Sequence, residues 1–461
     1  MSTDGLARAR AAMTAAEIPA PAIEVFEHNY RALADGETGL IPEDTIDPII
    51  ELEHIESVEV DDDAAREALA ATALIKLNGG LGTSMGMSRA KSLLPVRDGK
   101  TFLDLTIDQV RAAREKHGIR LPLVLMNSFS TAEDTREALA AHADIAVDGI
   151  PLDFLQSAEP KLLAADLTPV EWPADPRLEW CPPGHGDLSP SLLGSGVLDA
   201  LIEAGFRYAC VSNSDNLGAA PSAKLAGWFA STGATFAMEA CRRTEMDRKG
   251  GHLARRTFDG RLVLREVAQT SREEMFLFTD IARHRYFNTN TLWFDLPALR
   301  EALTERDGVL GLPLIRNEKT VDPRDPESPR VVQIETAMGA AIEVFADAQA
   351  IEVPRSRFLP VKSTSDLLLV RSDAFEVDGD ARLVPVASPT VELAPGPYRR
   401  IADFEDRFGE GVPSLRDSVA LIVQGDWRFG ADVHVAGAVV LGPEGGEVPA
   451  GTQLKREIVL P

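Results

Sequence analysis

The chain is poor in cysteine and has no long apolar run. Its three cysteines, Cys181, Cys210 and Cys241, lie far apart in a sequence of 461 residues. Such an odd and sparse set offers neither a disulfide framework nor a zinc-binding spacing, so we expect a reducing compartment, the cytoplasm. No apolar stretch approaches the roughly 20 residues that a membrane-spanning helix requires. The N-terminal stretch also lacks the pattern of a secretory signal.

Positive charge is scarce as well. The chain has 47 Lys and Arg residues against 72 Asp and Glu residues, which gives a net charge of −25. A surface this acidic repels nucleic-acid phosphates and anionic lipid, so a general role in binding nucleic acid or membranes is excluded. Only 10 of the 47 cations are lysines. A lysine inside a glycine-rich or proline-flanked motif is therefore a candidate for binding a phosphate.

The pattern along the chain divides it into three parts. Residues 1–55 are predicted to form an N-terminal helical segment, and residues 56–378 alternate strand and helix. This alternation predicts an α/β domain whose mainly parallel sheet carries helices on both faces. Residues 379–461 contain an apolar residue followed by a small one at six-residue spacing, which is typical of a left-handed β-helix. The repeats are Phe429-Gly430, Val435-Ala436 and Leu441-Gly442. A small β-meander is the alternative, and we expect this part to have a separate core.

Two helices are predicted from local signals. Thr101 is a candidate N-cap with Asp104 three residues later, and Gly118 is positioned to end that helix. A second helix is predicted over Gln333–Phe345, because four apolar residues recur at helical spacing. They are Ile334, Met338, Ile342 and Phe345.

A glycine-rich turn is the strongest chemical signal. The segment Leu77–Gly86 contains four glycines directly after a predicted strand, and Lys91 follows it. Glycines let a ligand approach the backbone closely, and successive N–H groups can hold an anion. The spacing fits neither a phosphate-binding Walker loop nor the dinucleotide fingerprint, which excludes a nicotinamide-dependent dehydrogenase. A tight surface turn is the alternative.

Two further motifs present polar groups in defined places. His185 stands between glycines in a rigid segment, Pro182–Asp187, where its ring could donate to a sugar or phosphate oxygen. Asp215 lies in Asn213–Gly218, just after a predicted strand, and ligands bind at this edge of open α/β sheets. One carboxylate together with substrate phosphates is the usual way to hold Mg²⁺. A satisfied histidine and a polar turn are the alternatives.

The last two motifs are a strand rich in amides and a basic loop. Phe287–Trp293 places asparagines in an otherwise apolar strand, and buried amides need partners such as sugar hydroxyls. Val353–Asp366 gathers Arg355, Arg357 and Lys362 between prolines, which favours a defined loop that points a cation inward. A solvated basic loop is the alternative.

Taken together, these motifs resemble the eukaryotic-type UTP–glucose-1-phosphate uridylyltransferases. The resemblance runs from about residue 75 to residue 375 and continues into the C-terminal tail. The segments that carry it are Leu77–Gly86, Lys91, Pro182–Asp187, Asn213–Gly218, Phe287–Trp293, Gln333–Ala341 and Val353–Asp366. It implies a Rossmann-like nucleotidyltransferase domain and a C-terminal left-handed β-helix. It also implies an enzyme that makes UDP-glucose and pyrophosphate from UTP and glucose 1-phosphate with Mg²⁺.

The resemblance also implies the functions of individual residues. The implied UTP-binding residues are Leu77, Asn78, Gly79, Gly80, Lys91, Gln156, Gly184, Asp215 and Lys362. The implied sugar-phosphate-binding residues are Gly79, Gly80, His185, Asn213, Ser214 and Asn290. Gln156 corresponds to the residue that reads the uracil. Lys91, Lys362 and Asp215 correspond to the catalytic groups, and Asp215 corresponds to the magnesium ligand.

The implied reaction is a substitution at the α-phosphorus of UTP, in which catalysis consists of positioning and charge stabilisation. Two other functions stay open. A uridylyltransferase for N-acetylhexosamine or for a broader range of sugar phosphates could share every motif, because fold and motif do not settle the sugar. A catalytically inactive nucleotide-sugar-binding or assembly protein is disfavoured, because it would not need Lys91, Asp215 and Lys362 together. The C-terminal tail could also join subunits into a homo-oligomer.

Overall fold

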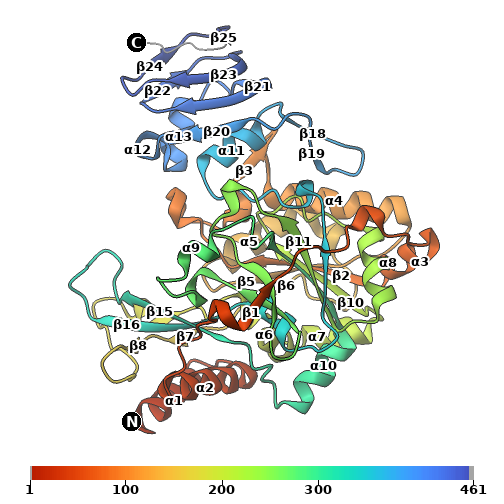
Figure 1. The fold of residues 1–461 in the computed structure, drawn as a ribbon, viewed down its shortest axis with the longest axis vertical. Coiled ribbons are helices and arrows are strands. Elements are labelled where there is room, and N and C mark those ends of the chain that lie inside the picture. Colours follow the sequence, from red (N-terminus) through yellow and green to blue (C-terminus); the bar gives the residue numbers. More distant parts are fainter. Residues whose placement is uncertain (1–2, 456–461) are drawn as a thin grey trace.

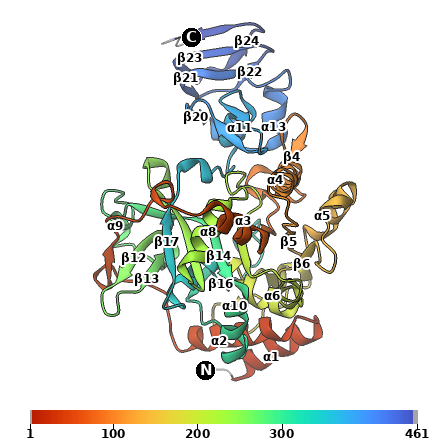
Figure 2. The same cartoon turned by 90° about the vertical axis from the view of Figure 1, so that its right-hand side faces the viewer.

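The computed structural model describes residues 3–455 of the chain. Two N-terminal helices lie at one end of the long axis and the C-terminal strands lie at the other, with the central sheet between them (Figures 1 and 2). Residues 1–2, and residues 456–461 of the expected C-terminal domain, lie outside the described part. Among the described residues, no helix combines the length and the apolarity that crossing a membrane requires.

A mixed ten-stranded sheet forms the middle of the molecule. Four adjacent strands run parallel in the order β10-β2-β5-β6: β10 (Tyr208–Asn213), β2 (Thr72–Asn78), β5 (Leu123–Asn127) and β6 (Asp153–Leu155). On the other side of β10 the sheet continues with antiparallel β14 (Tyr286–Asp295), then β11 (Phe236–Arg242) and β17 (Gln349–Glu352). Three further strands extend this side: β12 (His252–Arg256), β13 (Leu262–Arg265) and β1 (Ile46–Pro48). The predicted α/β class with a mainly parallel central sheet is confirmed.

Helices cover both faces of this sheet, as the sequence predicts. Along β2, Ala73 and Ile75 pack into one hydrophobic cluster and Leu74 packs into another, because successive side chains of a strand point to opposite faces. The first cluster includes side chains of α6 (Leu188–Gly194), α7 (Val197–Glu203) and α10 (Leu296–Glu305). The second includes side chains of α3 (Asp62–Ala70), α4 (Phe102–His117), α5 (Ala132–Leu139) and α8 (Ala223–Thr232).

Helix α4 begins and ends where the local signals predict. The Thr101 side chain accepts a hydrogen bond from the Asp104 backbone N–H, and the Asp104 carboxylate accepts one from the Thr101 backbone N–H. The two bonds complete a capping box. Gly118 follows the helix in the left-handed conformation, at φ 64°.

The predicted helix over Gln333–Phe345 is wrong. Residues Arg330–Thr336 form strand β16, which pairs with β15 (Leu314–Thr320) and β8 (Leu162–Leu163). Only Met338–Glu343 is helical, as a short 3-10 segment. The β-branched residues of the first half favour a strand, and an antiparallel partner satisfies its backbone groups. The apolar residues that suggested one helix therefore belong to two elements, a strand and a separate 3-10 turn.

The N-terminal helices are α1 (Thr3–Ala15) and α2 (Ala20–Ala34). They pack against the small sheet of β8, β15 and β16 through one apolar cluster. Helix α2 ends at Ala34, and residues 35–55 are not helical beyond short 3-10 turns. Its strand β1 instead joins the central sheet beside β12.

The C-terminal part begins with helices and hairpins that pack on the central domain. These elements are α11 (Thr364–Arg371), β18 (Phe375–Val377), β19 (Leu383–Pro385), α12 (Pro395–Tyr398) and α13 (Ile401–Arg407). Parallel strands then stack in two narrow sheets: β20 (Thr390–Leu393), β21 (Ser414–Val423), β23 (His434–Leu441) and β25 (Gln453–Lys455) in one, β22 (Trp427–Phe429) and β24 (Gly446–Val448) in the other.

Residues 379–461, as far as the structure describes them, do not form the separate hydrophobic core that we expected. One hydrophobic cluster joins Trp427 and Leu421 to Phe102 and Met85 of the central domain. This shared cluster arises because the short hairpin of β3 (Pro95–Arg97) and β4 (Lys100–Thr101), together with the start of α4, lies against the C-terminal helices α11 and α13 (Figure 2). The parallel pairing excludes a meander of antiparallel strands.

Candidate functional site

The predicted site residues gather where the parallel strands β2, β5, β6 and β10 end. The glycine turn follows β2 directly, with Gly82 and Gly86 in the left-handed conformation at φ 62° and 74°. The Lys91 backbone N–H donates to the Gly80 carbonyl at 3.0 Å, which closes the turn. A side chain at Gly79 would bring a Cβ within 2.7 Å of Gln156 Oε1. The turn therefore needs glycine both for its conformation and for the approach of a neighbouring segment.

Lys91 and Asp215 meet at the centre of this edge. The Lys91 ammonium lies 2.5 Å from Asp215 Oδ2, and each side chain is 16% exposed. Their loops are aligned because β2 and β10 are neighbours, and the Ser214 backbone N–H donates to the Leu77 carbonyl at 3.1 Å. A cation and a carboxylate thus face each other at the edge of the sheet where ligands bind.

Asn213 and Asn290 form a second contact at the same edge. The Asn290 Nδ2 group donates to Asn213 Oδ1 at 2.9 Å, and Asn290 has φ 58°. Asparagine tolerates this left-handed conformation better than most residues. The buried Asn290 Oδ1 has no hydrogen-bond partner in the described part of the chain. A hydroxyl or amide donor from a ligand would satisfy this acceptor.

The segment Pro182–Asp187 lies beside the glycine turn. Gln156 Nε2 donates to the Gly184 carbonyl at 3.1 Å, and the Gln156 side chain also lies close to Gly79. Gly184 has φ 78°, and a Cβ there would lie 2.6 Å from the Thr336 carbonyl oxygen. Asp187 accepts bonds from the Ser157 N–H at 2.7 Å and the Ser157 hydroxyl at 2.5 Å, which ties this segment to the residue after Gln156.

His185 is held in one tautomer. Its Nδ1 accepts a bond from the Met338 backbone N–H at 3.0 Å. Burial among protein atoms lowers the pKa of the imidazole to about 4, so the ring is neutral near pH 7. With Nδ1 occupied as an acceptor, the proton resides on Nε2. The ring can therefore donate one hydrogen bond to a ligand oxygen.

Asn78 and Lys362 stand apart from the other predicted residues. The Asn78 side chain is buried and donates to Asn127 Oδ1 at 2.7 Å and Thr135 Oγ1 at 2.9 Å, so only its backbone faces the turn. Lys362 is exposed, and its ammonium lies 5.7 Å from the centroid of the Phe358 ring. Among the described residues, no ion pair joins Lys362 to the Lys91–Asp215 pair.

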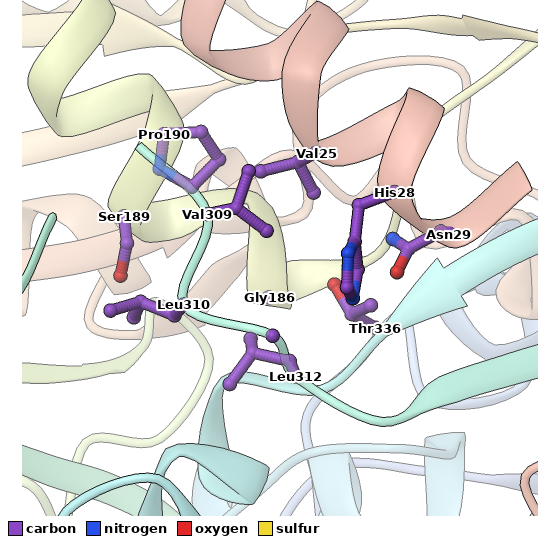
Figure 3. A pocket seen from close by; sticks show the side chains of 11 residues that line it. Val25, His28, Asn29, Gly186, Ser189, Pro190, Val309, Leu310, Leu312 and Thr336 are labelled. Atoms are coloured by element: carbon purple, nitrogen blue, oxygen red, sulfur yellow. The ribbon is translucent and has the colours of Figure 1, made fainter. Parts of the chain in front are cut away.

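A small cavity lies behind the His185 segment, under helix α2 (Figure 3). Val25, Gly186, Pro190, Leu310 and Thr336 are among its lining residues, and its volume is about 10 Å³. That is room for about one water molecule. A nucleotide sugar cannot enter it.

The metal-binding capacity of the site depends on Asp215. In residues 3–455, no three His, Cys, Asp or Glu side chains are grouped so that they could hold a metal ion. Asp215 uses Oδ2 for Lys91, and no hydrogen bond to its Oδ1 is present among the described residues. One free carboxylate oxygen fits Mg²⁺ in the manner that keeps phosphate oxygens and water as the other ligands. It does not fit an ion held by protein groups alone.

Known proteins resemble this chain in sequence and in fold. A family model described as UTP–glucose-1-phosphate uridylyltransferase matches residues 23–436. The chain belongs to this family.

Relatives of this uridylyltransferase family member agree over most of its length. The UTP–glucose-1-phosphate uridylyltransferase of Musa acuminata is 39% identical over 430 residues, which cover 91% of this chain and 87% of the relative. A mutant of UDP-glucose pyrophosphorylase from Leishmania major, solved in complex with UDP-glucose, has a TM-score of 0.93 and 41% identity. That similarity covers 99% of both chains. A trypanosomal relative, from Trypanosoma brucei, has a TM-score of 0.88 and 41% identity, with 99% of both chains covered.

Sequence reasoning missed a buried charge beneath this uridylyltransferase site. Lys76 lies inside β2, is 3% exposed, and donates to Ser212 Oγ at 2.8 Å and the Ala219 carbonyl at 3.0 Å. Burial lowers the pKa of its ammonium to about 8. The signal in the sequence that could have revealed Lys76 was a lysine within an apolar strand of a chain that has few lysines. Glu239 is also completely buried and receives Arg357, and no pattern in the sequence marked it.

Proposed function

We propose that this chain transfers the uridylyl group of UTP to glucose 1-phosphate, which forms UDP-glucose and releases pyrophosphate. The observation that carries the proposal is the Lys91–Asp215 pair, which stands beside a glycine turn at the carboxyl edge of a parallel sheet. Membership of the uridylyltransferase family supports the same reaction. The relatives of this chain include a UTP–glucose-1-phosphate uridylyltransferase and a UDP-glucose pyrophosphorylase solved in complex with UDP-glucose.

The chemistry is a displacement at phosphorus. An oxygen of the glucose 1-phosphate phosphate group forms a bond to the α-phosphorus of UTP, and the bond to the bridging oxygen of pyrophosphate breaks. A phosphate dianion is already a nucleophile, so no general base is required. The barrier comes from bringing two anions together, and the protein lowers it through positioning and fixed positive charge.

The proposed roles follow from the resemblance to the family and, for Lys91 and His185, from where the side chains lie. Lys91 would stabilise the leaving pyrophosphate, and Lys362 would bind the incoming phosphate. The backbone N–H groups from Leu77 to Gly80 would hold the nucleotide without adding side-chain bulk. His185 would donate its Nε2 proton to a sugar or phosphate oxygen, because its Nδ1 is already engaged.

The remaining assignments concern recognition. Gln156 would read the uracil together with the backbone of Gly184, since the two are bonded and lie beside the turn. Asn213, Ser214 and Asn290 would contact the sugar or its phosphate. The buried Asn290 Oδ1 that no described residue satisfies supports this role.

Asp215 would hold Mg²⁺ through the carboxylate oxygen that Lys91 leaves free. When bound, Mg²⁺ would neutralise charge on the nucleotide phosphates. Asp215 would also keep Lys91 extended across the site, because the pair spans the ends of β2 and β10. These two functions use different oxygens of one carboxylate.

Further proposals concern architecture and setting. We propose a catalytic domain over residues 56–378 and a left-handed β-helix over residues 379–461, supported by parallel strands stacked coil on coil. Trp427 pairs with Gly446 and His434 with Gln453, a spacing close to three six-residue repeats. A homo-oligomer through this part and a cytoplasmic location are also proposed. Three buried free cysteines favour a reducing compartment.

A pyrophosphate-release assay with a panel of nucleoside triphosphates and sugar 1-phosphates tests the function. We expect release with UTP and glucose 1-phosphate, and much less with ATP or GTP. Equal rates with every nucleotide would overturn the uridine assignment. A higher rate with N-acetylhexosamine 1-phosphate would overturn the glucose assignment.

A further inference from the structure

Arg357 lies on the loop that carries Lys362, but its side chain points the opposite way, into the protein. Its Nε donates to Glu239 Oε2 at 2.9 Å and its Nη2 donates to Glu239 Oε1 at 2.8 Å. Its Nη1 donates to the Ala220 carbonyl at 2.6 Å. The Glu239 side chain is completely buried and that of Arg357 is 12% exposed. The planar guanidinium therefore makes a two-pronged ion pair and holds a third group at the same time.

The backbone around Arg357 is fastened to the turn that carries Asp215. Asn216 Nδ2 donates to the Arg357 carbonyl at 3.2 Å, and Asn216 Oδ1 accepts the Leu359 N–H at 2.9 Å. A Cβ at Gly218 would lie 2.7 Å from the Arg357 carbonyl oxygen, so the two segments are in close contact. The loop with Lys362 and the turn with Asp215 are thus held together by hydrogen bonds from the Asn216 side chain and by close backbone packing at Gly218.

Glu239 connects this joint to the strand of the sugar-side asparagine. Its carboxylate also accepts the Trp293 indole N–H at 3.0 Å, and its backbone carbonyl accepts the Thr289 hydroxyl at 2.7 Å. Both partners belong to β14, which carries Asn290. Glu239 therefore links β14 to Arg357, whose backbone is bonded in turn to the segment that carries Asp215.

We infer that Glu239 and Arg357 are positioning residues, which set the place of Lys362 relative to Asp215 in the reaction proposed above. Neither side chain faces the reacting phosphates. A buried ion pair with several bonds restricts its segments to one geometry, and this restriction is a recognised use of such pairs. Lys362 itself has an exposed side chain with no ion pair among the described residues, so its position depends on how its loop is held. The inference depends on the proposed function.

Arg355 provides a matched control two residues away. It makes an equally direct ion pair, with its Nη1 2.6 Å from Asp247 Oδ2 and its Nη2 3.1 Å from Asp247 Oδ1. Its side chain is 44% exposed, and its ion-pair partner belongs to the segment after β11. Its guanidinium also lies over the rings of Phe287 and Phe358, a contact that a lysine ammonium can keep. Arg355→Lys and Arg357→Lys are the same chemical change on the same loop. Each keeps the charge and removes the fork.

The test compares initial rates of the full-length variants with UTP and glucose 1-phosphate each varied in turn. We expect Arg357→Lys to lower kcat about 10- to 100-fold, the scale of a small misplacement of reacting groups, and to leave the KM for UTP unchanged. Arg355→Lys should stay close to the wild type. In a Lys362→Ala background, Arg357→Lys should cause no further loss, because residues that act through one another are not additive.

Hydrogen exchange supplies a readout that needs no turnover. Amides of residues 355–362 should exchange faster in Arg357→Lys than in Arg355→Lys, while thermal melts show that both variants are folded. The inference is overturned if the two variants have equal kcat values, if the losses from Arg357→Lys and Lys362→Ala multiply, or if exchange is unchanged. A wild-type chain that exchanges as expected but has no uridylyltransferase activity would instead overturn the proposed function.

Discussion

The Lys91 ammonium and Asp215 Oδ2 lie 2.5 Å apart, and they belong to loops that follow two neighbouring parallel strands. Each charge is only 16% exposed, so each depends on the other for compensation in the structure described. In the proposed reaction Lys91 would stabilise the pyrophosphate, and the free oxygen of Asp215 would hold Mg²⁺. The first predictions follow from these two roles.

Asp215→Asn should remove metal-dependent turnover and leave the fold intact. The amide keeps the shape of the side chain but loses the charge that would hold Mg²⁺, and we expect a loss on the order of 10²-fold or more, as for one preorganised charged group. The measurement is turnover across a range of Mg²⁺ concentrations, with a thermal melt alongside. Asp259→Asn is the control, because Asp259 pairs with Arg256 in the turn between β12 and β13, outside the site. Near-normal turnover at every Mg²⁺ concentration would show that Asp215 does not hold the metal and has only a structural role in its turn.

Lys91→Ala and Lys362→Ala should affect different substrates. Both should lower turnover on the order of 10²-fold or more, because each would remove a point charge from the reacting phosphates. Lys91→Ala should act mainly on UTP and pyrophosphate, whereas Lys362→Ala should raise the KM for glucose 1-phosphate. Arginine should rescue neither, since its fork is larger and differently shaped. Initial-rate kinetics decide, with Lys100→Ala as the control because Lys100 is half exposed and pairs with Asp108 outside the site. Dispensable lysines would overturn the site assignment.

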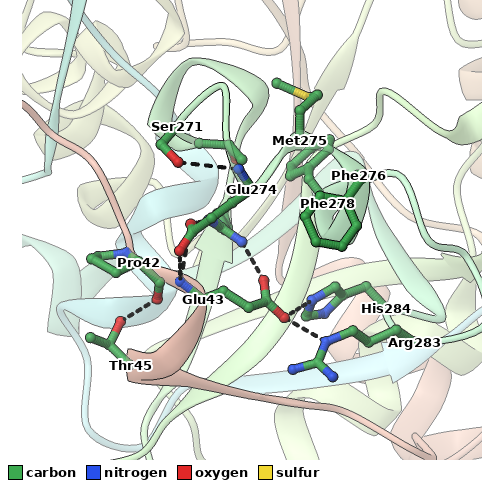
Figure 4. A network of polar contacts seen from close by, with 12 residues as sticks. Pro42, Glu43, Thr45, Ser271, Glu274, Met275, Phe276, Phe278, Arg283 and His284 are labelled. Carbon is green, nitrogen blue, oxygen red and sulfur yellow. Dashed lines mark hydrogen bonds and ion pairs between the residues drawn. The ribbon is translucent and has the colours of Figure 1, made fainter.

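A stacked pair of buried histidines should make the protein sensitive to acid. The rings of His252 and His284 lie 3.6 Å apart, and His284 contacts Glu43 in a network that includes Arg283 and Glu274 (Figure 4). Burial lowers the pKa of both histidines, and for His252 the charge of His284 adds to the effect. Neither ring nitrogen of His252 has a partner among the described residues. A proton on His252 would therefore be taken up mainly after unfolding.

The sign of the pH effect follows from linkage. Below the unfolded pKa of about 6.5, the unfolded chain binds a proton that the folded chain excludes, so the free energy of unfolding falls as the pH falls. Each such histidine contributes a slope of up to about 1.4 kcal/mol per pH unit. His252→Phe keeps a ring in the stack and should lose less stability than the wild type between pH 7 and pH 5, measured by urea unfolding. His434→Gln, at an exposed position, should match the wild type. Parallel losses in His252→Phe and wild type would contradict the prediction.

Removing residues 379–461 should destabilise the central domain. The truncation would uncover Phe102, Leu105 and Met85, which pack in the same cluster as Trp427. At about 25 cal/mol per Å² of apolar surface, even a modest exposed area costs several kcal/mol. We expect the fragment 1–378 to be less soluble, with a lower melting temperature, and co-expression with 379–461 to restore a soluble complex. A soluble fragment that melts like the full chain would show that the cores are independent.

The sequence determined the features that depend on near neighbours in the chain. The capping box of Thr101 and Asp104, the glycine turn after β2 and the alternation of strand and helix are local, so their residues alone specified them. The apolar pattern of Gln333–Phe345 misled for the same reason. A helical period and a strand followed by a turn look alike until β15 supplies a pairing partner.

Tertiary structure alone decided which distant groups meet. Lys91 and Asp215 are 124 residues apart, and only the parallel pairing of β2 with β10 brings them together. The inward direction of Arg357 depends on Glu239, a carboxylate from another strand whose burial no local pattern records. The shared core likewise required side chains of α4 and of the C-terminal strands to join one cluster. Local propensity determines the secondary-structure elements of this protein, whereas burial and long-range pairing determine its site. The free energies of burial and pairing arise only between segments that the fold has brought into contact.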